Sequence, residues 1–128
     1  MCTRVGNLIY TAGHLPVDAE GTIIAGRVGS ELTTDEGYAA ARSVALNIMA
    51  TLKKELGDLS RVERIVKLTA FVNCIESFSS QPKVVNGASD LLGDVFGEAG
   101  KHARSAVGVN ALPLNVPVEI EAIVLVKD

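Results

Sequence analysis

Three charged residues lie in a C-terminal stretch that is otherwise mostly aliphatic. The stretch is "ARSAVGVNALPLNVPVEIEAI", residues 103–123, and it contains Arg104, Glu119 and Glu121. Charged side chains are uncommon in such surroundings unless they are paired or used for binding or catalysis. A guanidinium presents a planar fork that fits a carboxylate, and a carboxylate in apolar surroundings can exchange a proton with bound water. The pattern predicts either a minimal hydrolytic site or a salt bridge between subunits.

The periodicity of the chain predicts the elements that must position these residues. Two segments have helical signals: residues 33–57 begin with a Thr33/Glu36 capping box, and residues 79–100 carry Pro82 near their start. Strands are predicted at residues 7–13 with a hairpin partner at Ile23–Ile24, at residues 61–75, and at residues 103–111 and 118–126. The order β-β-α-β-α-β-β predicts an α/β (α+β) fold, a single domain over residues 1–128, with antiparallel hairpins at both ends of a mixed sheet.

Alternation along the strands predicts which sheet face is covered. Right-handed crossovers place both helices on one face, and the opposite face is then left open. We expect the open face to carry these apolar and charged residues: Ile65, Thr69, Phe71, Ile123, Leu125, Arg104, Glu119 and Glu121. Such an apolar surface favours a closed ring of identical subunits, unless its apolar residues are only scattered singles.

Composition excludes several classes of function. The net charge is −3, and the chain has no basic run and no aromatic residues interleaved with basic ones, so we expect no nucleic-acid partner. The N-terminus lacks the apolar core of a signal peptide and no apolar run reaches membrane-spanning length, which predicts a cytoplasmic protein without a membrane contact. The chain has two cysteines and two histidines, and their spacing matches no metal-ligand motif, so we expect no bound metal. Cys74, at the end of a predicted strand, is expected to be a buried free thiol.

Three collinear segments resemble one protein family. The segment "RSAVGVNALPLNVPVEIEAI" resembles the C-terminal signature of the Rid family, the reactive intermediate deaminases, also known as the YjgF or liver perchloric-acid-soluble endoribonuclease family. The segments "GNLIYTAGHLPVD" and "RIVKLTAFVNCIESF" resemble its N-terminal segment and central strand. The resemblance covers about residues 6–126 and is nearest to a RutC-like branch.

The resemblance implies a chorismate-mutase-like fold assembled as a homotrimer, with sites between subunits that bind small carboxylates without metal or cofactor. Carried over by position, Arg104 would bind the substrate carboxylate and Glu119 would position or activate the attacking water. The backbone around Gly13 would line the pocket, and His14 could add a donor in place of the commoner Gln. This implies a hydrolase that converts enamines or imines to keto acid and ammonia.

The chain also departs from the family pattern. Ala12 stands where deaminating members often have Ser, Ala106 stands where they often have Cys, and a tyrosine that they place before the first strand is not found here. These departures favour a second reading, a non-catalytic trimer that binds carboxylate metabolites. An endoribonuclease ranks third, because the sequence has neither a basic track nor a histidine pair suited to acid–base chemistry.

Overall fold

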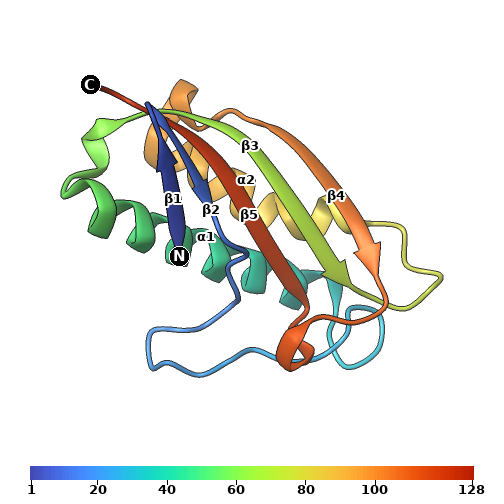
Figure 1. The fold of residues 1–128 in the computed structure, drawn as a ribbon. Helices are drawn as coiled ribbons and strands as arrows, with labels where there is room; N and C mark the ends of the chain where they lie inside the picture. The colour runs from blue at the N-terminus through green and yellow to red at the C-terminus, as the bar shows by residue number, and fades with distance from the viewer.

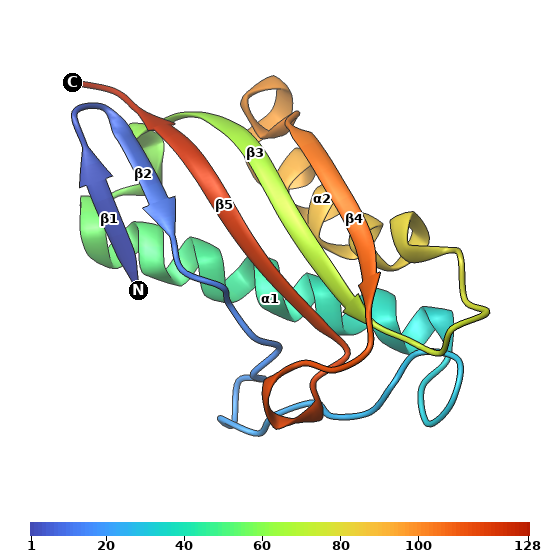
Figure 2. The same ribbon diagram turned by 45° about the vertical axis from the view of Figure 1, so that its right-hand side comes forward.

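The computed structural model describes all residues from 1 to 128 and contains a five-stranded sheet covered on one face by two helices (Figures 1 and 2). The strands are β1 (Cys2–Val5), β2 (Leu8–Thr11), β3 (Val62–Asn73), β4 (Ala103–Val109) and β5 (Val118–Val126), and the helices are α1 (Thr34–Leu56) and α2 (Gln81–Phe96). Three short 3-10 turns complete the chain: η1 (Leu59–Arg61), η2 (Gly97–Gly100) and η3 (Pro113–Asn115). The predicted α/β fold class, a mixed sheet with two helices on one face, is confirmed.

Local signals set the bounds of α1. The Thr33 side chain accepts a hydrogen bond from the Glu36 backbone, and the Glu36 side chain accepts one from the Thr33 backbone, so the predicted capping box is confirmed. The helix ends at Gly57, whose φ of 83° is strained for residues with a Cβ. Gly87 of α2 lies against the Tyr38 carbonyl, where a Cβ would collide with the backbone, so glycine permits the close approach of α2 to α1.

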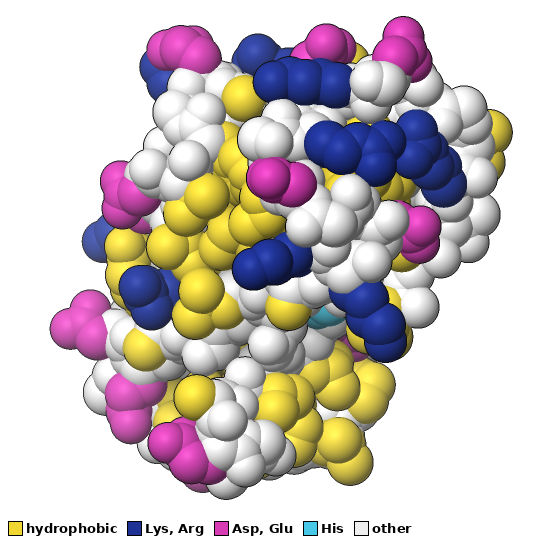
Figure 3. Space-filling model, turned by 90° about the vertical axis from the view of Figure 1, so that its left-hand side faces the viewer, with side chains coloured by type: hydrophobic (Ala, Val, Ile, Leu, Met, Phe, Trp, Pro, Cys, Tyr) yellow, Lys and Arg dark blue, Asp and Glu magenta, His cyan; other side chains and the backbone are white.

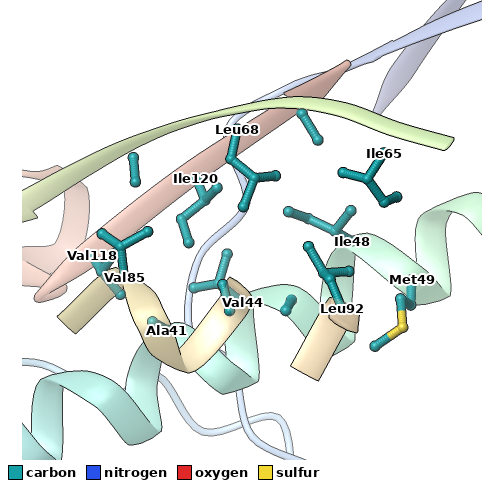
Figure 4. Packing of buried hydrophobic residues seen from close by; sticks show 14 of the residues in the cluster. Ala41, Val44, Ile48, Met49, Ile65, Leu68, Val85, Leu92, Val118 and Ile120 are labelled. Carbon is teal, nitrogen blue, oxygen red and sulfur yellow. The ribbon is translucent and has the colours of Figure 1, made fainter. Parts of the chain in front are cut away.

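The core lies between the sheet and the two helices. Side chains from α1, α2, β3 and β5 converge there, among them Val44, Ile48, Leu68, Leu92 and Ile120, and all five are buried (Figure 4). Their aliphatic character matches the scarcity of aromatic residues in the sequence. Neither helix combines the length and apolar composition that crossing a membrane requires.

Both predicted terminal hairpins are wrong. The N-terminal hairpin joins β1 to β2, upstream of the expected pair, and Ile23 makes only an isolated bridge to Val17. At the other end, β5 inserts between β2 and β3, while β4 pairs in parallel with β3 at the sheet edge. The crossover through α2 brings β4 beside β3, as strand–helix–strand connections favour, and β5 returns on the opposite side of β3.

The predicted placement of Ile65 on the open face is also wrong. Ile65 is fully buried against the helices, whereas Val66 is exposed. The pairing of β3 with β5 shifts register between Val62 and Arg64 and again between Ile65 and Lys67. Each shift adds one residue to β3, and an added residue reverses the side-chain alternation beyond it. From Leu68 to Val72 buried and half-buried side chains alternate regularly.

Candidate functional site

Arg104 lies on the helix-covered face of edge strand β4. It is paired in parallel register with Leu68, whose side chain is fully buried beneath the helices. Its Nη1 donates a hydrogen bond of 2.9 Å to Ser89 Oγ, and its Nη2 donates a longer one of 3.4 Å to the Pro82 carbonyl. Both acceptors belong to α2, so the half-buried guanidinium is held against the flank of that helix.

The prediction that Arg104 shares the open face with the glutamates is therefore wrong. Alternation assigned the more apolar set of β4, which includes Val107, to the helices. The register with β3 does the opposite, because Val107 pairs with Phe71 and is 45% exposed. A strand at the sheet edge meets the polar flank of α2 rather than its apolar stripe. The hydrophobicity of the β4 side chains therefore does not determine which face of β4 points toward the helices.

Glu119 lies on the open face of β5. It pairs with Phe71 and is half-buried, and Glu121, two residues further along the same face, is exposed. The carboxylate lies against Gly13, where an added Cβ would collide with Glu119 Oε2. The hydrogen bonds outside the helices and strands include none from the Gly13 N–H. A carboxylate and a backbone donor without a partner in the chain therefore lie side by side.

Ala12 and His14 flank this glycine but face different surroundings. Ala12 is exposed. His14 is only 2% exposed, and its Nδ1 lies 2.8 Å from the Ala12 carbonyl while its Nε2 lies 2.7 Å from Thr51 Oγ1 of α1. The imidazole thus connects the segment after β2 to α1, on the opposite side of the backbone from Glu119.

Burial of His14 predicts a dependence of stability on pH. Burial lowers the pKa of His14 below its ordinary value of 6.5, although the hydrogen bond to Ala12 opposes the shift. The unfolded chain therefore takes up the proton first, so stability is fully present above pH 6.5 and is lost as pH falls below it. In urea unfolding, wild type should lose up to about 1.4 kcal/mol per pH unit through this group, and His14→Gln should reduce that slope. An unchanged slope in His14→Gln would contradict the linkage.

Arg104 and Glu119 do not meet within one chain. They lie on opposite faces, two strands apart, and at different levels of the sheet, because Arg104 pairs with Leu68 and Glu119 pairs with Phe71. Ordinary strand spacing and rise then separate their Cα atoms by roughly 14 Å, with the side chains diverging. The one ion pair of the chain joins Lys101 to Glu98, so neither group is neutralised internally.

Ser89 and His102 are site features that sequence analysis did not identify. With Arg104 they line a cavity of about 300 Å³ that has no hydrophobic residue in its wall. The Ser89 hydroxyl lies 2.9 Å from His102 Nε2, and His102 Nδ1 lies 2.6 Å from the Gly100 carbonyl. Burial lowers the pKa of His102; the hydrogen bond to the Gly100 carbonyl opposes this shift, and the charge of Arg104 adds a smaller lowering. No spacing rule links Ser89 to His102, since only the packing of α2 on β4 brings them together.

A larger cavity of about 560 Å³ lies at the carboxyl ends of β3 and β4. Its wall includes Arg27, Cys74, Gln81 and Gly108. Arg27 is held by the Cys74 carbonyl and by Asn73 Oδ1, so its guanidinium braces the end of β3. Cys74 is buried and free, as the sequence predicted.

The surface charge is mixed. At one end of the molecule, Lys and Arg side chains are interspersed with Asp and Glu, with hydrophobic patches between and below them (Figure 3).

Comparisons with known proteins identify close relatives. Residues 2–124 match the family model described as "YjgF/chorismate_mutase-like, putative endoribonuclease". The protein TCP17 of Trypanosoma cruzi is 48% identical over 93% of this chain and 75% of its own length, and a RutC family protein of Pyrococcus abyssi is 33% identical over 94% and 80%. A protein named 2-iminobutanoate/2-iminopropanoate deaminase from Dermatophagoides farinae is 28% identical over 97% and 82%.

A solved structure agrees with the fold over nearly the whole chain. The crystal structure of Atu1372 from Agrobacterium tumefaciens, a protein described as having unknown function, has 44% identity and a TM-score of 0.97. The match covers 99% of this chain and 82% of that one. With the collinear motifs, the family model and this structural agreement, the chain belongs to the YjgF family, also called the Rid family, and resembles its RutC-like members.

Proposed function

We propose that this protein is a cytoplasmic hydrolase that deaminates small enamine or imine carboxylates to keto acid and ammonia, without metal or cofactor, as a homotrimer. Residues 1–128 would act as one Rid-like domain in each subunit. The observation that carries the proposal is the separation of Arg104 from Glu119 onto opposite faces of one sheet. Each group lacks an ionic partner inside its own chain. A complete site therefore needs Arg104 from one copy and Glu119 from another.

The open sheet face supports this assembly. It carries Tyr10 and Val107, which are 44% and 45% exposed, together with the half-buried Phe71. A ring of three copies would remove these side chains from water. It would also bring the Glu119–Gly13 face of one copy toward the β4 edge of the next, where Arg104 lies.

The reaction follows from the roles of these groups. Arg104 binds the carboxylate of a 2-imino acid through its fork, which places the C=N carbon toward the partner's face. Glu119 takes a proton from water as the oxygen attacks that carbon, forming a C–O bond and leaving the electron pair on nitrogen. The protonated Glu119 returns this proton to the nitrogen, which gives a carbinolamine. Glu119 then takes the hydroxyl proton and passes it to the same nitrogen, and the C–N bond breaks to release ammonia as the C=O bond forms. The Gly13 N–H can donate to the substrate or water throughout.

A second function, carboxylate binding without turnover, is favoured by Ala12. This residue is exposed next to Gly13 and presents a methyl group where many deaminating relatives have a hydroxyl. A site with the Arg104 anchor but one polar group fewer would still hold a keto acid. Release of keto acid from 2-aminoacrylate generated in situ, measured above the spontaneous rate, separates the two functions.

Subunit complementation tests the shared site. Arg104→Ala and Glu119→Gln should each be nearly inactive alone. When the two proteins are unfolded together and refolded at equal concentrations, about a quarter of the clefts should receive both wild-type residues, since each cleft draws its two residues independently from neighbouring subunits. Activity should therefore recover to about a quarter of that of wild type.

Two controls accompany the complementation. Light scattering should give a mass of three times 13.4 kDa for wild type, both variants and the mixture. Mixing Arg104→Ala with the double variant Arg104→Ala/Glu119→Gln should restore nothing, because no cleft then receives Arg104. A monomeric mass, or no recovery in the first mixture, contradicts a site shared between subunits.

A further inference from the structure

A chain of hydrogen bonds behind Arg104 takes no part in the reaction described above. Arg104 Nη1 donates to Ser89 Oγ at 2.9 Å, Ser89 Oγ lies 2.9 Å from His102 Nε2, and His102 Nδ1 lies 2.6 Å from the Gly100 carbonyl. The three side chains come from α2, from the residue before β4, and from β4 itself. They are therefore held by two packed elements rather than by one flexible loop.

The direction of each bond in this chain is set by chemistry. The Gly100 carbonyl can only accept, so His102 Nδ1 carries a proton. In the neutral ring Nε2 is then an acceptor, and the Ser89 hydroxyl donates to it. The Ser89 oxygen is left with its lone pairs, and it accepts from Arg104, which can only donate. While His102 is neutral, the Ser89 hydroxyl donates to Nε2; in a charged ring Nε2 would instead donate to Ser89 Oγ, which can accept from both His102 and Arg104.

The surroundings favour this neutral state. The charged side chains in the wall of the cavity are Lys101 and Arg104, while α2 contributes Asn86 and Ser89 and η2 contributes Gly100. No carboxylate lines the cavity that could stabilise an imidazolium. Burial, and to a smaller extent the charge of Arg104, lower the pKa of His102, although the hydrogen bond to the Gly100 carbonyl opposes this shift.

The Arg104 guanidinium is therefore held in place while some of its N–H donors remain free. An arginine has five N–H donors, and the hydrogen bonds to Ser89 and to the Pro82 carbonyl occupy two of them. Three remain for a ligand. An arginine that is already oriented loses less side-chain freedom when it binds a carboxylate than a mobile one does.

We propose that Ser89 and His102 are positioning residues that hold the Arg104 guanidinium in the orientation that binds the carboxylate of the substrate. The proposal rests on the role of Arg104 as anchor in the proposed function. It predicts that changes at Ser89 and His102 act through Arg104, although neither residue touches the reacting atoms.

NMR of the free protein tests the arrangement without a ligand. The ring nitrogens of His102 should show the neutral form with the proton on Nδ1. The Arg104 guanidinium should rotate slowly in wild type and faster in Ser89→Ala, while Ser89→Thr, which keeps a hydroxyl, should restore slow rotation. A proton on Nε2, or equal rotation rates in wild type and Ser89→Ala, would overturn the proposal.

Calorimetry with benzoate as the probe tests the consequence. Ser89→Ala and His102→Leu should each weaken binding about 3- to 10-fold, the effect of losing one pre-ordered side chain. Ser89→Thr and His102→Gln should stay within about 2-fold of wild type, because each keeps the required hydroxyl or acceptor. In an Arg104→Ala background, Ser89→Ala should have no further effect.

The two experiments separate the possible failures. If wild type does not bind benzoate, the anchor role in the proposed function is wrong, and the NMR rates still decide whether Ser89 and His102 orient Arg104. If wild type binds but Ser89→Ala binds equally well, or weakens binding equally in the Arg104→Ala background, the positioning proposal is wrong.

Discussion

Glu119→Gln should lose about 10²–10⁴-fold in the rate of imine hydrolysis while keeping most of the affinity for keto acids, because a general acid–base group typically contributes that much. Glutamine has nearly the shape of glutamate, so the close fit against Gly13 is retained, but it cannot take a proton from water. The rate is measured as keto acid released from 2-aminoacrylate generated in situ, and the affinity by calorimetry with pyruvate.

Glu121→Gln is the matched control for this change. Glu121 lies on the same strand and the same face, two residues away, but it is exposed and pairs with Thr69 rather than with Phe71. Its substitution should lower the rate far less. Equal losses in the two variants would show that the charge of the face, rather than proton transfer at Glu119, supports the reaction.

Arg104→Ala should weaken the binding of small carboxylates such as pyruvate or benzoate by about 1.5–3 kcal/mol, which is the range for a hydrogen bond to a charged group. This corresponds to roughly a 10- to 150-fold increase in Kd. Arg104→Lys should restore only part of the affinity, since an ammonium lacks the planar fork and cannot keep the bonds to both Ser89 and Pro82. Isothermal titration of the assembled protein measures both effects.

Lys101→Ala is the control for charge alone. Lys101 lines the same cavity and carries the same charge, but it is exposed and already paired with Glu98. Its loss should change the affinity by less than about threefold, because an exposed, paired cation contributes little. If Lys101→Ala weakened binding as much as Arg104→Ala, net charge rather than a directed fork would explain carboxylate binding.

The residues of the candidate site follow from sequence motifs, whereas their arrangement does not. The motif positions name Arg104, Glu119 and Gly13, and the structure brings Glu119 and Gly13 together. The sequence analysis, however, predicted that Arg104 lies on the same open face of the sheet as the two glutamates. That prediction was wrong because it assumed that the more apolar side of β4 faces the helices. β4 is an edge strand that lies against the polar flank of α2, so the burial of apolar side chains does not fix its orientation.

The sequence by itself determined the features that depend on neighbours in the chain: the start of α1 at its capping box, its end at Gly57, the crossover between β3 and β4, and the family motifs. Only the tertiary structure decided the two added residues in β3 that bury Ile65, the insertion of β5 beside β3, and the contact of Ser89 with His102. Caps and turns are stabilised within a few residues, so their signals are local. Strand register and helix docking are set by contacts between distant segments, and no short-range pattern in the sequence specifies them.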